Sequence, residues 1–197
     1  PFDGDAVCRL RDLKGREHKP FAVMYPDLEA LCAHCEVSAE ERALIASTAR
    51  PIVLLVRKRC AISERVYGSS PYLGAFLSYT PLQQLILRKT GPLVMTSANI
   101  SSLPIIKDDA EMIDFFNRQS ELAGVLYHDR AILRRLDDSV AQVVRGEAHI
   151  ARRARGYVPL PIATQKRAPD ILALGAQEKS AICLHKQGFL YPSAEIG

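Results

Sequence analysis

Apolar residues fall into two patterns along this chain of 197 residues. Short continuous runs predict strands over residues 21–24, 52–56, 93–95 and 125–127. The run Ile52–Val56 is apolar at every position, which is typical of a strand buried on both faces. The stretch 60–78 contains Gly68, Pro71 and Gly74, and we expect it to be irregular.

Helical spacing of apolar residues lies between these runs. Val7, Leu10 and Leu13 predict a first helix, with Asp5 as N-cap and Gly15 at its end. Further helices are predicted over 28–35 and after a capping box at 38–41. Another begins at Thr80-Pro81, with Leu82, Leu85 and Ile86 as its apolar face. A last one follows Asp108 or Asp109, with Met112, Ile113 and Phe116 as its buried stripe.

The order of these elements predicts the fold class. Strands that alternate with helices indicate an open, twisted α/β sheet, and a hairpin over 139–151 makes the sheet mixed. Residues 157–168 are rich in proline and read as a linker. The runs 171–174, 180–184 and 189–191 are spaced like the first strands of a second sheet. The predicted parts are therefore 1–156, the linker 157–168, and 169–197.

Composition narrows the classes of partner. The chain is 48% hydrophobic and 24% charged, as is usual for a globular protein. Its net charge of +4 is mild, which favours a local site for an anion over a surface that coats nucleic acid. No run of about 18 apolar residues suggests a membrane helix.

Five scattered cysteines suit a reducing compartment, so we expect a cytoplasmic protein. Cys32-Ala-His-Cys35 has the spacing of half a zinc knuckle, but the sequence offers no second pair. We therefore expect buried structural cysteines and no metal site in this chain.

The first candidate site is a cationic loop before the first strand. Lys14, Arg16 and Lys19 precede the apolar run, and Gly15 lets the backbone leave a helix in the left-handed conformation. Arginine and lysine held in this way suit phosphate or carboxylate groups. The alternative is a solvated charged turn.

The second candidate site follows the strand predicted at 93–95. Ser97, Asn99 and Ser101 lie where open α/β sheets place their ligand crevice, and small hydroxyl side chains let backbone N–H groups approach an oxyanion. The alternative is a turn whose side chains satisfy its own backbone.

Two further cationic segments follow. Residues 134–139 carry two arginines and two aspartates, which suit a metal–nucleotide complex or surface ion pairs. Residues 152–157 carry three arginines, for which a solvated surface is the default. There is no P-loop, no GxGxxG and no Ser-His-Asp order, and phosphate chemistry driven by positioned cations needs no nucleophile.

These motifs together resemble a known family. They are Lys-x-Arg-x-x-Lys-Pro-x-Ala-x-Met at 14–24, Tyr-Thr-Pro-Leu at 79–82, Thr-Ser-x-Asn-x-Ser at 96–101, Asp-Asp-Ser-Val at 137–140 and Arg-Arg-x-Arg-Gly-Tyr-Val-Pro at 152–159. In this order they resemble the YrdC-like domain of the HypF family, carbamoyltransferases of NiFe-hydrogenase maturation. Residues 169–197 look like the opening of the Kae1-like domain, an actin-like ATPase type of domain, that follows it there.

The resemblance implies an activity. ATP converts carbamoyl phosphate to carbamoyl-adenylate in the YrdC-like domain, with Mg²⁺, and the carbamoyl group passes to the partner protein HypE. It implies Lys14, Arg16 and Lys19 as catalytic residues and Ser97, Asn99 and Ser101 as nucleotide ligands. Arginines expected to close over the nucleotide are Arg130, Arg135, Arg153 and Arg155.

The resemblance also implies that the chain is a fragment, inactive alone. The family's acylphosphatase domain, its zinc-finger region and the first YrdC-like strands are expected upstream, and zinc only there. Two alternatives stay open: a threonylcarbamoyl-adenylate synthase of tRNA modification, and a non-catalytic module that binds double-stranded RNA. Few aromatic residues, 7%, accompany the cations, which disfavours RNA recognition by stacking.

Overall fold

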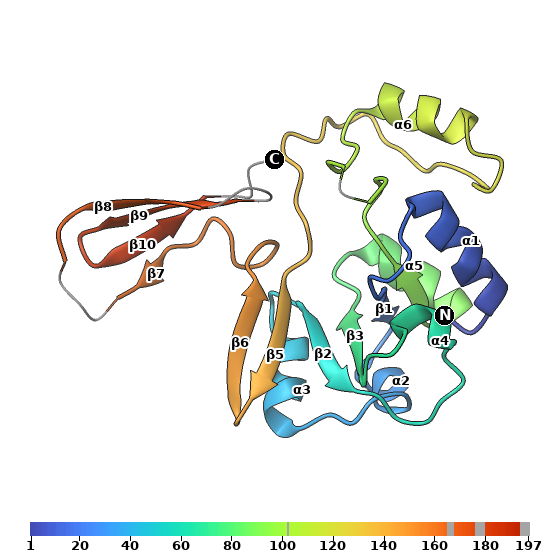
Figure 1. Ribbon diagram of the computed structural model, residues 1–197, viewed down its shortest axis with the longest axis horizontal. Helices are drawn as coiled ribbons and strands as arrows, with labels where there is room; N and C mark the ends of the chain where they lie inside the picture. The colour runs from blue at the N-terminus through green and yellow to red at the C-terminus, as the bar shows by residue number, and fades with distance from the viewer. Residues whose placement is uncertain (102, 165–167, 176–179, 194–197) are drawn as a thin grey trace.

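Six strands between residues 22 and 152 form one mixed sheet in a computed structural model of the chain (Figure 1). The structure describes residues 1–101, 103–164, 168–175 and 180–193. The strands are β1 Ala22–Tyr25, β2 Ile52–Val56, β3 Tyr72–Leu77, β4 Leu93–Met95, β5 Val140–Val144 and β6 Glu147–Arg152. Their order is β4-β1-β3-β2-β5-β6, in which β1–β3 and β2–β5 are parallel and the other neighbours antiparallel. The predicted α/β fold with a mixed sheet is confirmed.

Five helices cover the two faces of this sheet. They are α1 Gly4–Lys14, α2 Leu28–Cys32, α3 Ala39–Ala46, α4 Glu64–Tyr67 and α5 Pro81–Thr90. The first four share one core with the strand residues of one face, among them Val23, Val53 and Ala75. On the other face the buried apolar cluster is small, consisting of Met24 and Phe76 under Leu87 of α5. The rest of that face is therefore open to form a site.

Strand β2 shows this asymmetry directly. Val53 and Leu55 are fully buried, whereas Ile52 and Leu54, which point to the other face, are only partly buried. The prediction that this strand is buried on both faces is thus wrong for its second face.

The stretch 60–78 is not irregular, which corrects the prediction. It contains helix α4 and strand β3, which lies between β1 and β2 in the sheet. Gly74, taken as a breaker, is part of β3, and a Cβ there would lie 3.2 Å from Ile52 Cγ2 and 3.5 Å from Ala22 Cβ. The glycine therefore marks a close approach of the two neighbouring strands and does not end β3.

The capping residues of the helices are those predicted from the sequence, with one exception. Asp3, not Asp5, caps α1, because its carboxylate accepts hydrogen bonds from the backbone N–H groups of Asp5 and Ala6. Gly15 ends α1 in the left-handed conformation, φ 56°, as predicted. The predicted starts of α3 and α5 are confirmed, and each carries a full capping box.

The apolar face predicted for α5 is not buried. Leu82, Leu85 and Ile86 are 50%, 61% and 39% exposed, and Leu87 is the residue that packs against the sheet. The spacing predicted the helix correctly but not its orientation.

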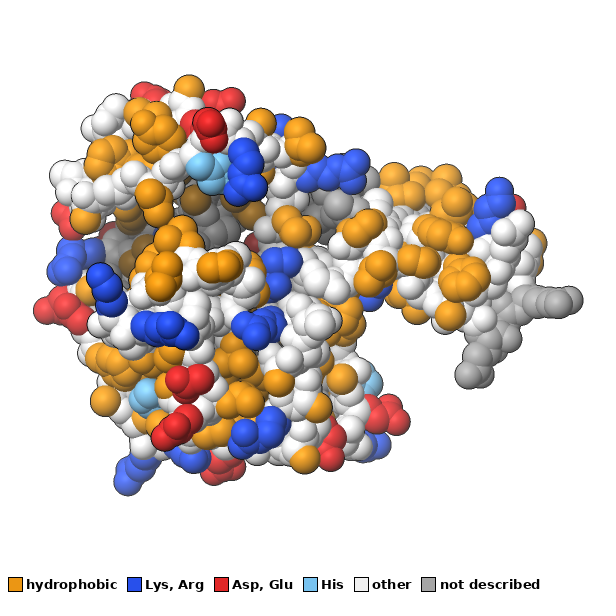
Figure 2. All heavy atoms as spheres, turned by 180° about the vertical axis from the view of Figure 1, so that it is seen from behind, with side chains coloured by type: hydrophobic (Ala, Val, Ile, Leu, Met, Phe, Trp, Pro, Cys, Tyr) orange, Lys and Arg blue, Asp and Glu red, His pale blue; other side chains and the backbone are white. Residues whose placement is uncertain are grey.

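The second sheet has the order β7-β10-β9-β8 (Figure 1). Its strands are β7 Ile162–Ala163, β8 Ile171–Leu174, β9 Ile182–Lys186 and β10 Phe189–Pro192. Strand β7 lies within the stretch predicted as a linker. Its residues form a strand there because they pair with β10. Apolar side chains gather on the face of this sheet seen in Figure 2, and Leu172 and Leu174 are 63% and 72% exposed.

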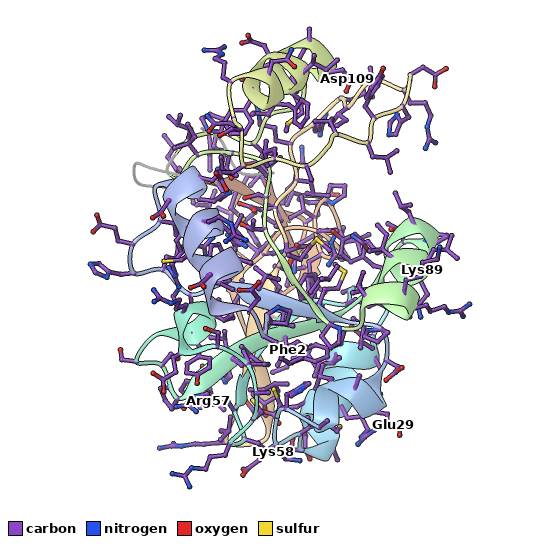
Figure 3. The ribbon with its side chains drawn as sticks, turned by 90° about the vertical axis from the view of Figure 1, so that its right-hand side faces the viewer. Phe2, Glu29, Arg57, Lys58, Lys89 and Asp109 are labelled. Atoms are coloured by element: carbon purple, nitrogen blue, oxygen red, sulfur yellow. The ribbon has the colours of Figure 1, made fainter. Side chains whose placement is uncertain are left out.

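Helix α6, Asp109–Asn117, begins at Asp108 as predicted, but no residue of it is fully buried. Figure 3 shows this helix, marked by Asp109, apart from the helices that cover the sheet. Residues 125–127 form no strand, and Leu126 and Tyr127 are 75% and 63% exposed, so that prediction is wrong. None of the helices in the described ranges is long and apolar enough to cross a membrane.

Candidate functional site

A cavity of about 560 Å³ lies on the open face of the six-stranded sheet. Its floor is a row of cross-strand neighbours, since Met95 pairs with Ala22, Ala22 with Gly74, and Gly74 with Leu54. Alternate residues of a strand share a face, so register alone brings these four small or apolar residues together. The floor can therefore accept a flat apolar group.

The two candidate loops are bonded directly to each other at one wall of this cavity. Lys14 is 5% exposed, and its Nζ donates to the carbonyl oxygen of Ser97 at 2.5 Å and to Oδ1 of Asn99 at 2.8 Å. The backbone N–H of Ser101 donates to the carbonyl oxygen of Lys14 at 2.8 Å. The cationic loop and the hydroxyl-rich loop therefore form a single unit.

The loop 96–101 also satisfies part of its own polar surface. Ser97 Oγ donates to Asn99 Oδ1 at 2.6 Å, and Asn99 Nδ2 donates to the carbonyl oxygen of Leu103 at 2.6 Å. The alternative of a self-satisfied turn is thus partly realised. These hydrogen bonds fix Asn99 in the orientation that receives Lys14.

Arg16 is held over the rim of the cavity. Its Nε donates to the carbonyl oxygen of Lys19 at 3.0 Å, its Nη2 to that of Pro20, and its Cζ lies 4.5 Å from the centre of the Phe21 ring. Nη1 lies 3.5 Å from Thr96 Oγ1 on the other loop. Carbonyls and an aromatic face thereby fix the guanidinium where both loops meet.

Burial and like charges depress the pKa values of these cations. The pKa of Lys14 is lowered to about 8, chiefly by burial and then by the nearby charges of Arg16 and Lys19, against the opposing effect of Asp137. Burial likewise lowers the pKa of Arg16, with Arg11 and Arg152 adding to the effect. Cations crowded in this way favour a bound anion, because it relieves their mutual repulsion.

The structure places the predicted site residues in two groups. Those that line the cavity are Lys14, Arg16, Lys19, Ser97, Asn99 and Ser101. The four arginines expected to close over a nucleotide lie elsewhere. Arg130 is exposed, and Arg135 donates to the carbonyl oxygen of Ile105 at 2.5 Å beside a neighbouring cavity of about 340 Å³.

The other two arginines are held by fixed acceptors. Arg153 Nη2 donates to the carbonyl oxygens of Tyr157 and Leu160, both at 2.9 Å. Arg155 donates to Asp138 Oδ1 at 2.7 Å and to two carbonyl oxygens, those of residues 49 and 50, and stacks on a tyrosine ring. These guanidinium groups hold the chain after β6 in place, and their role in closing over a nucleotide stays a prediction.

Six polar residues of the cavity were not among the predicted site residues: Ser70, Tyr72, Thr96, Asp137, Asp138 and Arg152. Arg152 pairs with Val140 across the β5–β6 hairpin, and Val140 pairs with Ile52 of the floor. The pairing shifts by one residue between Val140 and Ala141, so simple alternation from Ile150 would put Arg152 on the opposite face, and the sequence carried no signal that could have found it.

The described part of the chain holds no group of three or more His, Cys, Asp or Glu side chains arranged for a metal ion. Asp137 and Asp138 contact Arg152 and Arg155 instead. A metal at this cavity would need ligands from a bound molecule, as Mg²⁺ finds in nucleotide phosphates.

Comparison with known proteins gives the family. The sequence model of the Sua5–YciO–YrdC family, described as telomere recombination, matches residues 1–154. The carbamoyltransferase HypF of Synechocystis is 41% identical over 99% of this chain, and the probable carbamoyltransferase HypF of Methanocaldococcus jannaschii 32% identical over 99%. The chain spans 26% of the length of each.

Comparison with solved structures gives the same relatives. Full-length HypF in its phosphate- and nucleotide-bound form has a TM-score of 0.89 and 40% identity over the whole chain, which covers 31% of that protein. Sua5 of P. abyssi, solved with L-threonine, has a TM-score of 0.66 over 78% of this chain and 45% of its own, at 16% identity, which shows a shared fold alone. The chain therefore belongs to the Sua5–YciO–YrdC family, and it is similar to the YrdC-like part of the HypF carbamoyltransferases.

Proposed function

We propose that this chain is the nucleotide-binding part of a carbamoyltransferase that activates carbamoyl phosphate with ATP during hydrogenase maturation. One observation carries the proposal: Lys14, Arg16 and the loop of Ser97 and Asn99 converge on a cavity with an apolar floor. The likeness to a HypF structure in a phosphate- and nucleotide-bound form supports it.

The reaction balances as follows. Carbamoyl phosphate, ATP and water give carbamoyl-adenylate, pyrophosphate and phosphate. Water first cleaves the bond between the carbamoyl group and the phosphate of carbamoyl phosphate, which releases phosphate and leaves carbamate. A carbamate oxygen then bonds to the α-phosphorus of ATP, and the bond from that phosphorus to the pyrophosphate oxygen breaks. Negative charge grows on the pyrophosphate, so the step needs positioned cations and no protein nucleophile.

The cavity suits these reactants by its polarity. The floor of Ala22, Gly74 and Leu54 offers an apolar seat for adenine. Lys14 and Arg16 lie at the end where phosphates would be bound, and Nη1 of Arg16, whose contact with Thr96 Oγ1 is 3.5 Å long, would donate to a phosphate oxygen. Mg²⁺ would enter with the ATP phosphates and neutralise part of their charge.

The acceptor of the carbamoyl group is a further part of the proposal. Residues 169–197 would begin a Kae1-like domain, in which the group passes to the partner protein HypE in the cytoplasm. The separate second sheet, β7 to β10, supports a division of the chain after residue 156.

The rival activities gain less support. Likeness to Sua5 extends to the fold only, at 16% identity, so it does not favour threonine as substrate. For RNA binding, an exposed cationic track is needed. Arg153 and Arg155 instead donate to acceptors within the chain.

The test is ATP–pyrophosphate exchange by the full-length protein. We expect label from pyrophosphate to enter ATP only when carbamoyl phosphate is present. Exchange that requires threonine and bicarbonate would move the function to the tRNA-modifying relative. RNA affinity with a steep salt dependence and no exchange would make the chain a binding module.

A further inference from the structure

The cationic loop, residues 15–20 between α1 and β1, forms neither helix nor strand. Its Arg16 nevertheless stands at the rim of the cavity. The carbonyl oxygens of such a loop lie outside the bonding pattern of helix and sheet, so a loop with a fixed shape needs other donors. Arg11, in the last turn of α1, supplies them.

The guanidinium of Arg11 donates to four backbone carbonyl oxygens. Its Nη1 lies 2.8 Å from the carbonyl oxygen of Arg16, 3.1 Å from that of Glu17 and 3.2 Å from that of Lys19. Its Nε donates to the carbonyl oxygen of Arg65, in α4, at 2.8 Å. A planar group with several fixed donors can hold such a set, whereas the compact ammonium group of lysine cannot. One side chain thus connects the end of α1, the cationic loop and α4.

Arg11 and Arg16 share two partners. Nε of Arg16 donates to the carbonyl oxygen of Lys19 at 3.0 Å, and Arg11 contacts the same oxygen. Both guanidinium groups also lie over the ring of Phe21, with Cζ 4.9 Å from the ring centre for Arg11 and 4.5 Å for Arg16. Phe21 is 1% exposed, so this ring is a fixed surface. The position of Arg16 therefore depends on that of Arg11.

The closeness of these two guanidinium groups is electrostatically unfavourable. After burial, the charge of Arg11 is the first cause that lowers the pKa of Arg16. The carbonyl oxygens and the aromatic ring offset this repulsion, because both attract a guanidinium group. Among the described residues, those that line the cavity do not include Arg11. Arg11 can therefore act on a bound molecule only through the loop that it holds.

We propose that Arg11 is a positioning residue for the proposed reaction, which holds the loop so that Arg16 and Lys19 stand at the cavity before any ligand binds. The proposal rests on the proposed function, because it assumes that this loop acts on phosphorylated reactants. Cations that are fixed in advance need no reorganisation when charge develops. A displacement of about 1 Å can lower a rate about a hundred-fold. The proposal concerns the geometry of the Arg11 donors and not its charge.

Limited proteolysis of the full-length protein without ligand tests whether Arg11 holds the loop. A glutamate-specific protease should cut slowly after Glu17 in the wild type, and Arg11→Lys should speed this cut by about tenfold or more, with other cuts unchanged. Arg9→Lys is the matched control, since Arg9 lies on the same helix and its ion pair with Glu121, 3.6 Å long, is exposed. A wild-type loop that is cut at once, and becomes resistant only with ATP, overturns the proposal even where Arg11→Lys fails to fold.

Kinetics test whether the held loop serves the reaction. Arg11→Lys should lower kcat/KM in carbamoyl phosphate-dependent ATP–pyrophosphate exchange by about ten- to a hundred-fold, and Arg9→Lys should leave it unchanged. When Arg16 is already Gln, the further loss from Arg11→Lys should shrink to about threefold or less, because Arg11 acts through Arg16. A merely structural role would give the same loss in both backgrounds.

The outcomes separate this proposal from the proposed function. Wild-type exchange together with full activity of Arg11→Lys, or with equal losses in the two backgrounds, overturns the role of Arg11 and upholds the proposed function. A wild-type protein without carbamoyl phosphate-dependent exchange overturns both.

Discussion

Lys14 is the residue on which the candidate site depends. Its ammonium group connects the two loops through Ser97 and Asn99, and at 5% exposure it is the most buried charged side chain of the cavity. Burial makes its charge sensitive to pH, because the pKa of Lys14 falls to about 8.

Anion affinity should therefore fall as pH rises through about 8. Below that pH Lys14 is protonated and attracts phosphate; above it the free site loses the proton, and affinity drops about tenfold per pH unit. The check is a series of ATP dissociation constants from about pH 7.5 to about pH 9.5. Lys14→Gln should bind weakly with no fall over this range, and an equal fall in that variant would show that another group titrates.

Cys32 and Cys35 should hold no zinc. Cys35 is 1% exposed, and burial together with the neighbouring Cys60 and Cys32 raises the pKa of its thiol to about 12. Zinc binds the thiolate, which this environment suppresses. Metal analysis of the purified chain should find far less than one zinc per molecule. Stoichiometric zinc that disappears when both are changed to serine would contradict this.

Sequence could identify the loop residues but not their partners. Lys14, Arg16, Ser97 and Asn99 each carry a local signal, namely charge or hydroxyl groups beside a strand. Arg152 reaches the cavity through strand register, which depends on pairing between distant segments, and Asp137 lines the cavity in contact with it. Choosing among neighbouring arginines required that register.

Among the elements, the turn that follows β6 is fixed by close packing. Gly156 has φ 87°, and a Cβ there would lie 2.6 Å from Ala49 Cα and 2.8 Å from Ala49 O. Backbone atoms cannot move aside as a flexible side chain can. The position therefore excludes every residue but glycine.

Gly156→Ala should lower the free energy of unfolding by about 2–5 kcal/mol, through backbone strain plus the clash with Ala49. Gly68→Ala is the matched control, since Gly68 has φ 61° with nothing within 4 Å of a Cβ. Urea denaturation of both variants measures the difference. Equal losses would mean that strain alone acts and that the contact with Ala49 is loose.

Elements with strong end signals were predictable, and those defined by long-range packing were not. The capping boxes at Ser38 and Thr80 and the Arg145-Gly146 turn act locally, so their helices and hairpin were predicted correctly. Strand β3 was missed because Gly74 breaks an isolated pattern and is favoured only between Ile52 and Ala22. The orientation of α5 likewise depends on which face meets Phe76.

At the scale of the whole molecule, the open face of the six-stranded sheet determines what the chain can bind. Helices α1 to α4 pack against one face, and α5 covers part of the other. The uncovered part becomes the floor of the cavity, and the loops after α1 and β4 become its wall. The central claim is that these two loops act on one anion.

Kinetics of Lys14→Ala, Asn99→Ala and the double variant test that claim most directly, in carbamoyl phosphate-dependent ATP–pyrophosphate exchange by the full-length protein. Each single change should lower the rate by about ten- to more than a hundred-fold, with little loss of thermal stability. The double change should lower it by less than the product of the two, because Lys14 and Asn99 are bonded and act on one transition state. Losses that multiply, or that follow from unfolding, would contradict the account and leave the cationic loop a charged turn.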